Sequence, residues 1–189
     1  MIIIYGGAFN PPTKAHYLIA KKLIDEFKPD NFYFLPVGEK YDKKGMASFK
    51  ERFQMTKILA DLLPNAVVSD KENEEKFRGT YYMLKDFSLV DKDIYFVMGA
   101  DNFDYLDEWI MADKLIEEFK FIILTREGYD VYNLINEKYY KNKDNFTVIE
   151  IDYPISSTYF RNTKDNELLL DEVYRYILEN KLYEVTDNA

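Results

Sequence analysis

Residues 1–16 read MIIIYGGAFNPPTKAH, and this stretch decides the fold that we expect for the whole chain. Residues 2–5 are apolar, mostly β-branched and uncharged, which is typical of a strand buried on both faces. Because Gly6 and Gly7 lack a Cβ, the backbone after this strand can turn sharply and lie close to a ligand. Two prolines then disfavour helix, so the pattern predicts that a helix begins near Thr13.

Thr13 and His16 are three residues apart, so both are expected on one face of the first turn of that helix. The N–H groups of a first turn have no intrahelical acceptor and lie at the positive end of the helix dipole, which attracts phosphate. His16 is the only histidine in the sequence. The stretch therefore predicts a phosphate site that can also carry out chemistry.

Composition indicates a globular protein. The 189 residues are 47% hydrophobic and 31% charged, with a net charge of −9 and no cysteine. The negative charge argues against a nucleic-acid partner. No run approaches the roughly 20 apolar residues of a membrane span, and no basic flank of a signal peptide is present. Without cysteines, disulfides are excluded and a cytoplasmic location is favoured, while a homo-oligomer is left open.

Strand and helix patterns alternate along the chain. Expected strands cover residues 2–5, 31–37, 66–69, 93–99, 119–125 and 146–152. Expected helices cover residues 16–27, 49–63, 80–87 and 132–140, one or two segments up to 118, and a pair within 157–183. This alternation predicts an α/β fold with a doubly wound, mostly parallel Rossmann-like sheet. We expect a single domain over residues 1–189, in which about 155–189 form a small helical part.

A second stretch with hydroxyl groups, ISSTYFR, covers residues 155–161. Ser and Thr favour helix N-caps, and capping alone would explain them. Three hydroxyls followed one turn later by Arg161 also suit a polyphosphate. From the residues alone, we leave the cap and the phosphate site as equal alternatives.

Other candidates follow strands or lie in a polar loop. Asp101 comes just after a predicted strand, as either a ligand contact or a helix cap. Trp109 is either a core residue or a ring on which a ligand stacks. Arg126 follows the next strand and is by default a surface ion-pair partner. The lysine-rich loop 38–50 is either a solvated face or a mobile lid.

With both stretches stated, a resemblance can be named. GGAFNPPTKAH and ISSTYFR resemble, in order, the two signatures of the nucleotidyltransferase superfamily. Within it the chain is most similar to the bacterial nicotinate-nucleotide adenylyltransferases, nearly from end to end. Four further stretches carry this likeness: VMGADNF with the later tryptophan, residues 78–81, residues 124–126, and the tail VYRYILENKLY at 173–183.

The resemblance implies adenylyl transfer from ATP to nicotinate mononucleotide, with release of pyrophosphate. Those two nucleotides would be the partners, and Mg²⁺ is expected on the ATP phosphates without a separate protein metal site. No covalent intermediate is expected, so catalysis would consist of positioning and charge stabilisation. By this resemblance the catalytic residues are His16, Thr13 and Arg161.

The resemblance also assigns residues to the two nucleotides. The ATP side would comprise Gly6, Gly7, Ala8, Phe9, Asn10, His16, Lys43, Gly99, Asp101, Arg126, Ser156, Ser157, Thr158 and Arg161. The side of nicotinate mononucleotide would comprise Lys43, Lys44, Thr80, Tyr81, Asp101 and Trp109. Thr80 and Tyr81 would act through backbone donors suited to a carboxylate, and Trp109 would stack on the pyridine ring.

The chain departs from the family pattern at Thr13, where the first signature usually has histidine. A threonine hydroxyl can donate to a phosphate oxygen, but it cannot carry a positive charge. Threonine here is also the habit of phosphopantetheine adenylyltransferase, which is therefore one alternative. A nucleotide-binding regulator without turnover is the other.

Overall fold

The computed structural model describes residues 1–40, 45–75, 77–125, 130–153 and 156–185. Its centre is a six-stranded sheet in the order β3-β2-β1-β4-β5-β6, in which every neighbouring pair is parallel. The strands are β1 (Ile2–Gly7), β2 (Asn31–Pro36), β3 (Ala66–Val68), β4 (Ile94–Gly99), β5 (Lys120–Thr125) and β6 (Phe146–Glu150). This confirms the predicted α/β class.

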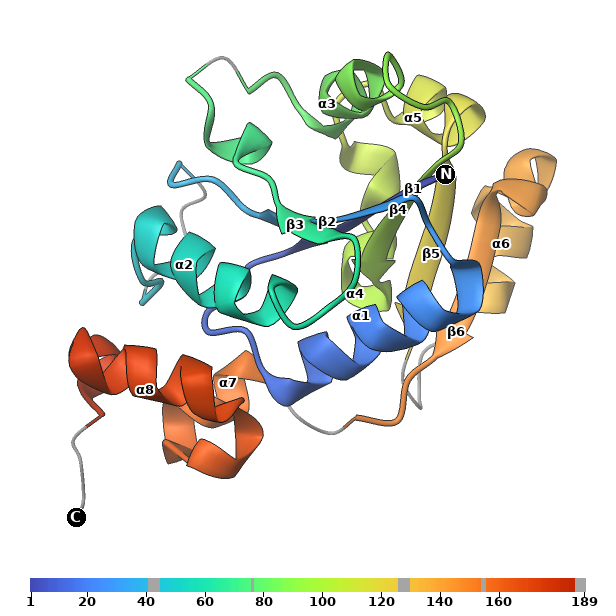
Figure 1. Cartoon of the computed structure of the whole chain (residues 1–189). Coiled ribbons are helices and arrows are strands. Elements are labelled where there is room, and N and C mark those ends of the chain that lie inside the picture. Colours follow the sequence, from blue (N-terminus) through green and yellow to red (C-terminus); the bar gives the residue numbers. More distant parts are fainter. Residues whose placement is uncertain (41–44, 76, 126–129, 154–155, 186–189) are drawn as a thin grey trace.

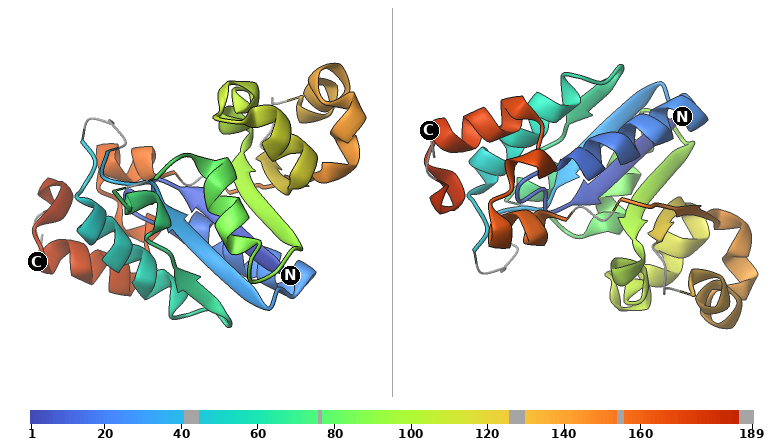
Figure 2. Two further views of the ribbon diagram at one scale, coloured as in Figure 1. Left: turned by 90° about the horizontal axis from the view of Figure 1, so that it is seen from above. Right: turned by 90° about the horizontal axis from the view of Figure 1, so that it is seen from below.

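Helices cover both faces of the sheet (Figures 1 and 2). One face carries α1 (Lys14–Phe27) and α2 (Phe49–Ala60). The opposite face carries α3 (Thr80–Phe87), α4 (Ala100–Phe103), α5 (Ala112–Glu118) and α6 (Val131–Lys138). The sheet is thus doubly wound, as the alternating pattern predicts.

The first strand shows why its sequence is uninterrupted by polar residues. Ile2, Ile3 and Ile4 have no exposed surface. Because side chains alternate along a strand, Ile3 packs with α1 and α2 whereas Ile2 and Ile4 pack into the core beneath α3 and α5. A strand with helices on both sides has no face that tolerates a charge.

Strand order reverses between β1 and β4. The chain passes from β1 outward to β2 and β3, then returns to pair β4 with the other side of β1. In open parallel sheets, ligands bind at the carboxyl ends of strands beside such a point. Here those ends are Gly7 and Gly99.

The C-terminal part forms a third apolar cluster, separate from the two cores of the sheet. It contains α7 (Ser157–Thr163) and α8 (Asp171–Glu179), which lie beside α2 in Figure 1. Phe160 and Ile177 are fully buried there together with Met55 of α2. The predicted helical part is therefore attached to the sheet domain through α2.

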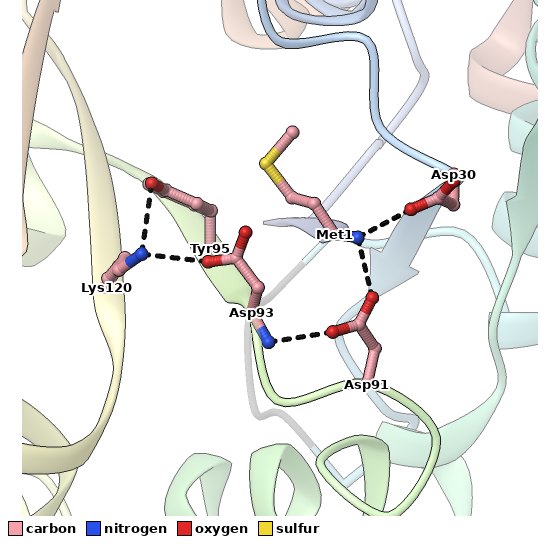
Figure 3. A network of polar contacts seen from close by, with 6 residues as sticks. All are labelled: Met1, Asp30, Asp91, Asp93, Tyr95 and Lys120. Atoms are coloured by element: carbon pink, nitrogen blue, oxygen red, sulfur yellow. Dashed lines mark hydrogen bonds and ion pairs between the residues drawn. The ribbon is translucent and has the colours of Figure 1, made fainter.

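A polar network fastens the amino end of β1 (Figure 3). The amino group of Met1 donates to carboxylates of Asp30 and Asp91, at 2.6 Å each. These carboxylates raise the pKa of the amino group to about 10. Asp93 and Lys120 extend the network toward β5, so it joins loops at the edge opposite the carboxyl ends of the strands.

Some boundaries differ from those predicted. Helix α1 begins at Lys14 with Thr13 as its N-cap, which confirms the start predicted near Thr13 and lies two residues before the apolar pattern of 16–27. Between β3 and α3, the chain forms a 3₁₀ turn, η1 (Lys71–Asn73). No helix within the described ranges is long and apolar enough to cross a membrane.

Candidate active site

A cavity of about 430 Å³ opens at the carboxyl ends of β1 and β4. It is bordered by the loop after β1, the start of α1, the start of α4 and the start of α7. Its lining includes Gly6, Gly7, Ala8, Asn10, His16, Gly99, Asp101, Ser156, Ser157, Thr158 and Arg161. Most residues expected on the ATP side are therefore brought to one place, although the two signatures are about 140 positions apart.

His16 lines the cavity, and Thr13 contacts one nitrogen of its ring. Its Nδ1 accepts the backbone N–H of Thr13 at 3.0 Å and lies 2.8 Å from Thr13 Oγ1. Because Nδ1 is occupied as an acceptor, a neutral ring carries its proton on Nε2. His16 can therefore present a donor to an anion.

Thr13 has a different place from the one that we expected. It has no exposed surface and is not among the residues that line the cavity. Phe9 is also buried, 1% exposed, and its ring meets the His16 ring edge-on at 5.1 Å. Thr13 and Phe9 thus support His16 and do not themselves form the cavity wall.

Glycine allows the backbone to pass close to two aromatic rings. A Cβ on Gly6 would lie 2.9 Å from the ring of Phe96, and one on Gly7 would lie 3.1 Å from Phe9. A Cβ on Gly99 would lie 2.4 Å from Oδ1 of Asp101. The Asp101 carboxylate therefore lies over the end of β4, at the cavity.

The hydroxyl groups of the second signature divide their roles. Ser156 is the N-cap of α7 and accepts the N–H of Tyr159 at 3.1 Å, which is the capping alternative. Ser157 donates to the carbonyl of Pro11 at 2.8 Å. The hydroxyl of Thr158 accepts from Arg161 Nη2 at 3.0 Å.

Arg161 also crosses to the first signature. Its Nη1 donates to the carbonyl of Asn10 at 2.6 Å. The side chain is half-buried and lines the cavity. The guanidinium is therefore held by groups from both signatures, with its remaining N–H groups beside the cavity.

Arg52 supports the backbone of a lining residue, and sequence reasoning missed it. It lies in α2, has no exposed surface, and donates from Nη1 to the carbonyl of Ala8 and from Nε to that of Ala47. Burial lowers the pKa of its guanidinium. An arginine within an amphipathic helix usually indicates an exposed position, and nothing in the local pattern distinguishes this one.

Of the described residues expected beside nicotinate mononucleotide, Asp101 lines the cavity, whereas Thr80, Tyr81 and Trp109 lie outside its lining. Tyr81 is 8% exposed and donates from its hydroxyl to Glu118 at 3.0 Å. Trp109 is half-buried and packs edge-on against Phe96 at 6.1 Å. Since Phe96 also touches Gly6, Trp109 is one ring away from the cavity.

Thr80 is the first residue of α3 and is half-buried. Gly79 is the N-cap of this helix and has a φ of 106°. A Cβ on Gly79 would lie 3.2 Å from the side chain of Ile110. The first N–H groups of this helix have no acceptor within it. They are donors of the kind that a carboxylate requires.

Three expected contacts, Lys43, Lys44 and Arg126, lie outside the described residues, as does Ile155 of the second signature. In the described ranges, no group of three or more His, Cys, Asp or Glu side chains could hold a metal ion. Asp101 supplies a carboxylate at the cavity. That donor fits a cation that obtains its other ligands from phosphates.

The model of the cytidylyltransferase-like family matches residues 4–163. A relative from Acholeplasma laidlawii, named "Probable nicotinate-nucleotide adenylyltransferase", is 39% identical and covers 97% of this chain and 98% of its own. The chain belongs to the cytidylyltransferase-like family. A relative of the same name from Clostridium acetobutylicum is 33% identical over 95% of this chain and 97% of its own.

Solved structures agree on the fold of this adenylyltransferase family member. The nicotinic acid mononucleotide adenylyltransferase of Plasmodium falciparum, complexed with NaAD, superposes with a TM-score of 0.78. It is 24% identical, and the match covers 97% of both chains. The family model and the relatives confirm the expected family, and this structure confirms the expected fold.

Proposed function

We propose that the chain transfers the adenylyl group of ATP to nicotinate mononucleotide in the cavity at the carboxyl ends of β1 and β4. A phosphate oxygen of the acceptor attacks the α-phosphorus of ATP, the bond from that phosphorus to the bridging oxygen breaks, and pyrophosphate leaves. The 39% identity over nearly the whole chain to a relative of that name supports the assignment.

His16 is the proposed donor to the α-phosphate. Its neutral ring carries the proton on Nε2 because Nδ1 accepts from Thr13. A donor held in place stabilises the charge that develops on the α-phosphate oxygens, without reorganisation during the reaction. Thr13 acts through His16 and is a positioning residue in this proposal.

Arg161 and Thr158 are the proposed partners of the β- and γ-phosphates. A guanidinium suits phosphate because it offers several donors in one plane. Ser157 completes this side of the cavity, although its own hydroxyl hydrogen is directed to Pro11 in this structure. Mg²⁺ would be carried by the phosphates, with Asp101 as the nearest carboxylate at the lining.

The acceptor would bind between Trp109 and the start of α3. The contact of Trp109 with Phe96, and of Phe96 with Gly6, supports this location, because it connects the ring to the cavity. The first N–H groups of α3 would receive the carboxylate of the nicotinate ring. A nicotinamide ring has no such charge and would bind more weakly.

The observation that carries the proposal is the convergence of His16 and Arg161 on one cavity from opposite ends of the sequence. The test is pyrophosphate release from Mg-ATP with three acceptors in parallel: nicotinate mononucleotide, nicotinamide mononucleotide and phosphopantetheine. The proposal expects release mainly with the nicotinate compound. Release only with phosphopantetheine, or no release with any acceptor, would refute it.

A further inference from the structure

The C-terminal turn of the chain reaches the wall of the cavity. This turn, η5 (Leu182–Glu184), follows α8, and Tyr183 donates from its hydroxyl to Oδ1 of Asn10 at 2.6 Å. Asn10 is 4% exposed and lines the cavity. A residue near the end of the chain thus contacts a residue of the first signature.

Asn10 has both lone pairs of its amide oxygen engaged. Oδ1 accepts from Tyr183 and also from the backbone N–H of Ala47 at 3.0 Å. Nδ2 donates to the carbonyl of Gly45 at 3.3 Å. An amide has two acceptor sites and two donor hydrogens. Among the described contacts, what is left to face a ligand is one N–H.

The backbone of the C-terminal turn has several positive φ angles around Tyr183. Lys181, Tyr183 and Glu184 all have positive φ, between 54° and 56°. Non-glycine residues enter this region only at a cost in conformational energy, so three of them within four positions require a compensating interaction. Tyr183 provides one, because its ring packs edge-on against Phe160 at 6.0 Å and its hydroxyl reaches Asn10.

We propose that Tyr183 is a positioning residue that fixes the amide of Asn10, so that the cavity receives an N–H donor and never the amide oxygen. The ligand group that Asn10 contacts is then an acceptor without hydrogens, and a phosphate oxygen of ATP has that chemistry. The inference rests on the proposed function because it takes ATP as the occupant of the cavity.

Removal of the Tyr183 hydroxyl frees one lone pair of Asn10 Oδ1. Oδ1 then keeps only the N–H of Ala47, so the amide is held less firmly and its N–H donor is less well aligned with the phosphate. The expected result for Tyr183→Phe is a weaker affinity for ATP, by about 2- to 10-fold, the usual range for one hydrogen bond. The ring and its contact with Phe160 are retained.

Tyr176 offers a matched control. It belongs to the same C-terminal part, and its hydroxyl donates to Glu51 on α2 at 2.6 Å, away from the cavity lining. Tyr176→Phe therefore removes a similar bond between the same two parts of the protein. We expect its ATP affinity to equal that of the wild type.

The experiment is calorimetric titration of the full chain with Mg-ATP for the wild type, both tyrosine variants, Asn10→Ala and the double variant Asn10→Ala with Tyr183→Phe. If Tyr183 acts through Asn10, the single substitution Tyr183→Phe weakens ATP binding, but the same substitution causes no further loss of affinity in the Asn10→Ala variant. Equal losses in both tyrosine variants, additive losses in the double variant, or no loss in Tyr183→Phe would overturn the inference.

This titration needs no acceptor and no turnover, so its result is separate from the test of the proposed function. A wild type that binds ATP but releases no pyrophosphate would refute the proposed reaction and leave the comparison of variants valid. Circular dichroism of each variant checks that the fold is intact.

Discussion

Glu72 should make the protein less stable as the pH rises from 4.5 to about 7. It lies in η1 beneath the loop after β2, where its backbone carbonyl is 2.2 Å from the place of a Cβ on Gly38. Burial raises the pKa of its carboxyl from 4.5 to about 7, against the opposing effects of a Gly38 N–H and of Arg52. The carboxyl therefore binds its proton more tightly in the folded state than in the unfolded state.

The sign and size follow from this difference. Between pH 4.5 and about 7 the folded protein holds more protons than the unfolded chain, so the free energy of unfolding falls as the pH rises. A rise of the pKa from 4.5 to about 7 corresponds to at most about 3 kcal/mol. The Glu72 side chain retains some exposure, and screening by water reduces this figure.

The assay is urea unfolding at pH 5, 6, 7 and 8 for the wild type and Glu72→Gln, which cannot titrate. We expect the variant to gain stability over the wild type progressively with pH, by about 1 to 3 kcal/mol between pH 5 and 8. Glu75→Gln, at an exposed neighbouring position, is the control and should keep the pH dependence of the wild type. A difference between Glu72→Gln and the wild type that stays constant from pH 5 to 8 would refute the reasoning.

Three further predictions concern the site. Thr13→Val removes the hydroxyl beside His16 Nδ1 and should lower kcat by about 2- to 10-fold with little change in ATP affinity, whereas Thr13→Ser should keep the kcat of the wild type. Steady-state rates test this prediction, and an unaltered kcat in Thr13→Val would contradict it. Trp109→Ala should raise the KM for nicotinate mononucleotide more than the KM for ATP, and equal increases would assign Trp109 to the core alone. Gly99→Ala should displace the Asp101 carboxylate, since the new Cβ would lie 2.4 Å from its Oδ1. The expected result is a higher KM for Mg-ATP at an unchanged melting temperature. A normal KM would mean that binding of Mg-ATP does not depend on the position of the Asp101 carboxylate.

The fold could be predicted because local patterns and tertiary needs agree in most of the chain. Strand β1 is buried on both faces and must carry apolar side chains on each, and this requirement is visible in the sequence as an unbroken apolar run. The predicted strand at 93–99 and the predicted helix at 80–87 lie where β4 and α3 are found. The start of α1 was predicted near Thr13 from the two prolines before it, and Thr13 is the N-cap of that helix.

The site was predictable in outline and not in its supporting contacts. The glycine turn with His16, and Ser157 with Arg161, each have a pattern that suits phosphate, and the cavity brings them together. Thr13 looked like a phosphate ligand because its spacing from His16 places both on one helix face. That spacing does not reveal that Thr13 is fully buried and bonded to His16 Nδ1.

Two long-range contacts had no signal in the sequence. Arg52 reads as an exposed residue of an amphipathic helix, yet it is buried and bonded to Ala8. Tyr183 reads as one tyrosine among 17, and its contact with Asn10 spans 173 positions. Such contacts depend on how distant elements pack, which periodicity and spacing do not encode.

The most direct test of the account is the effect of His16→Ala on pyrophosphate release from Mg-ATP with nicotinate mononucleotide, measured beside the ATP affinity of the same variant. The account predicts a fall in kcat by about 100-fold or more with a modest loss of ATP affinity, because His16 would stabilise charge that develops only in the transition state. A variant that folds normally and keeps near-normal turnover would contradict the assignment of this cavity as the active site.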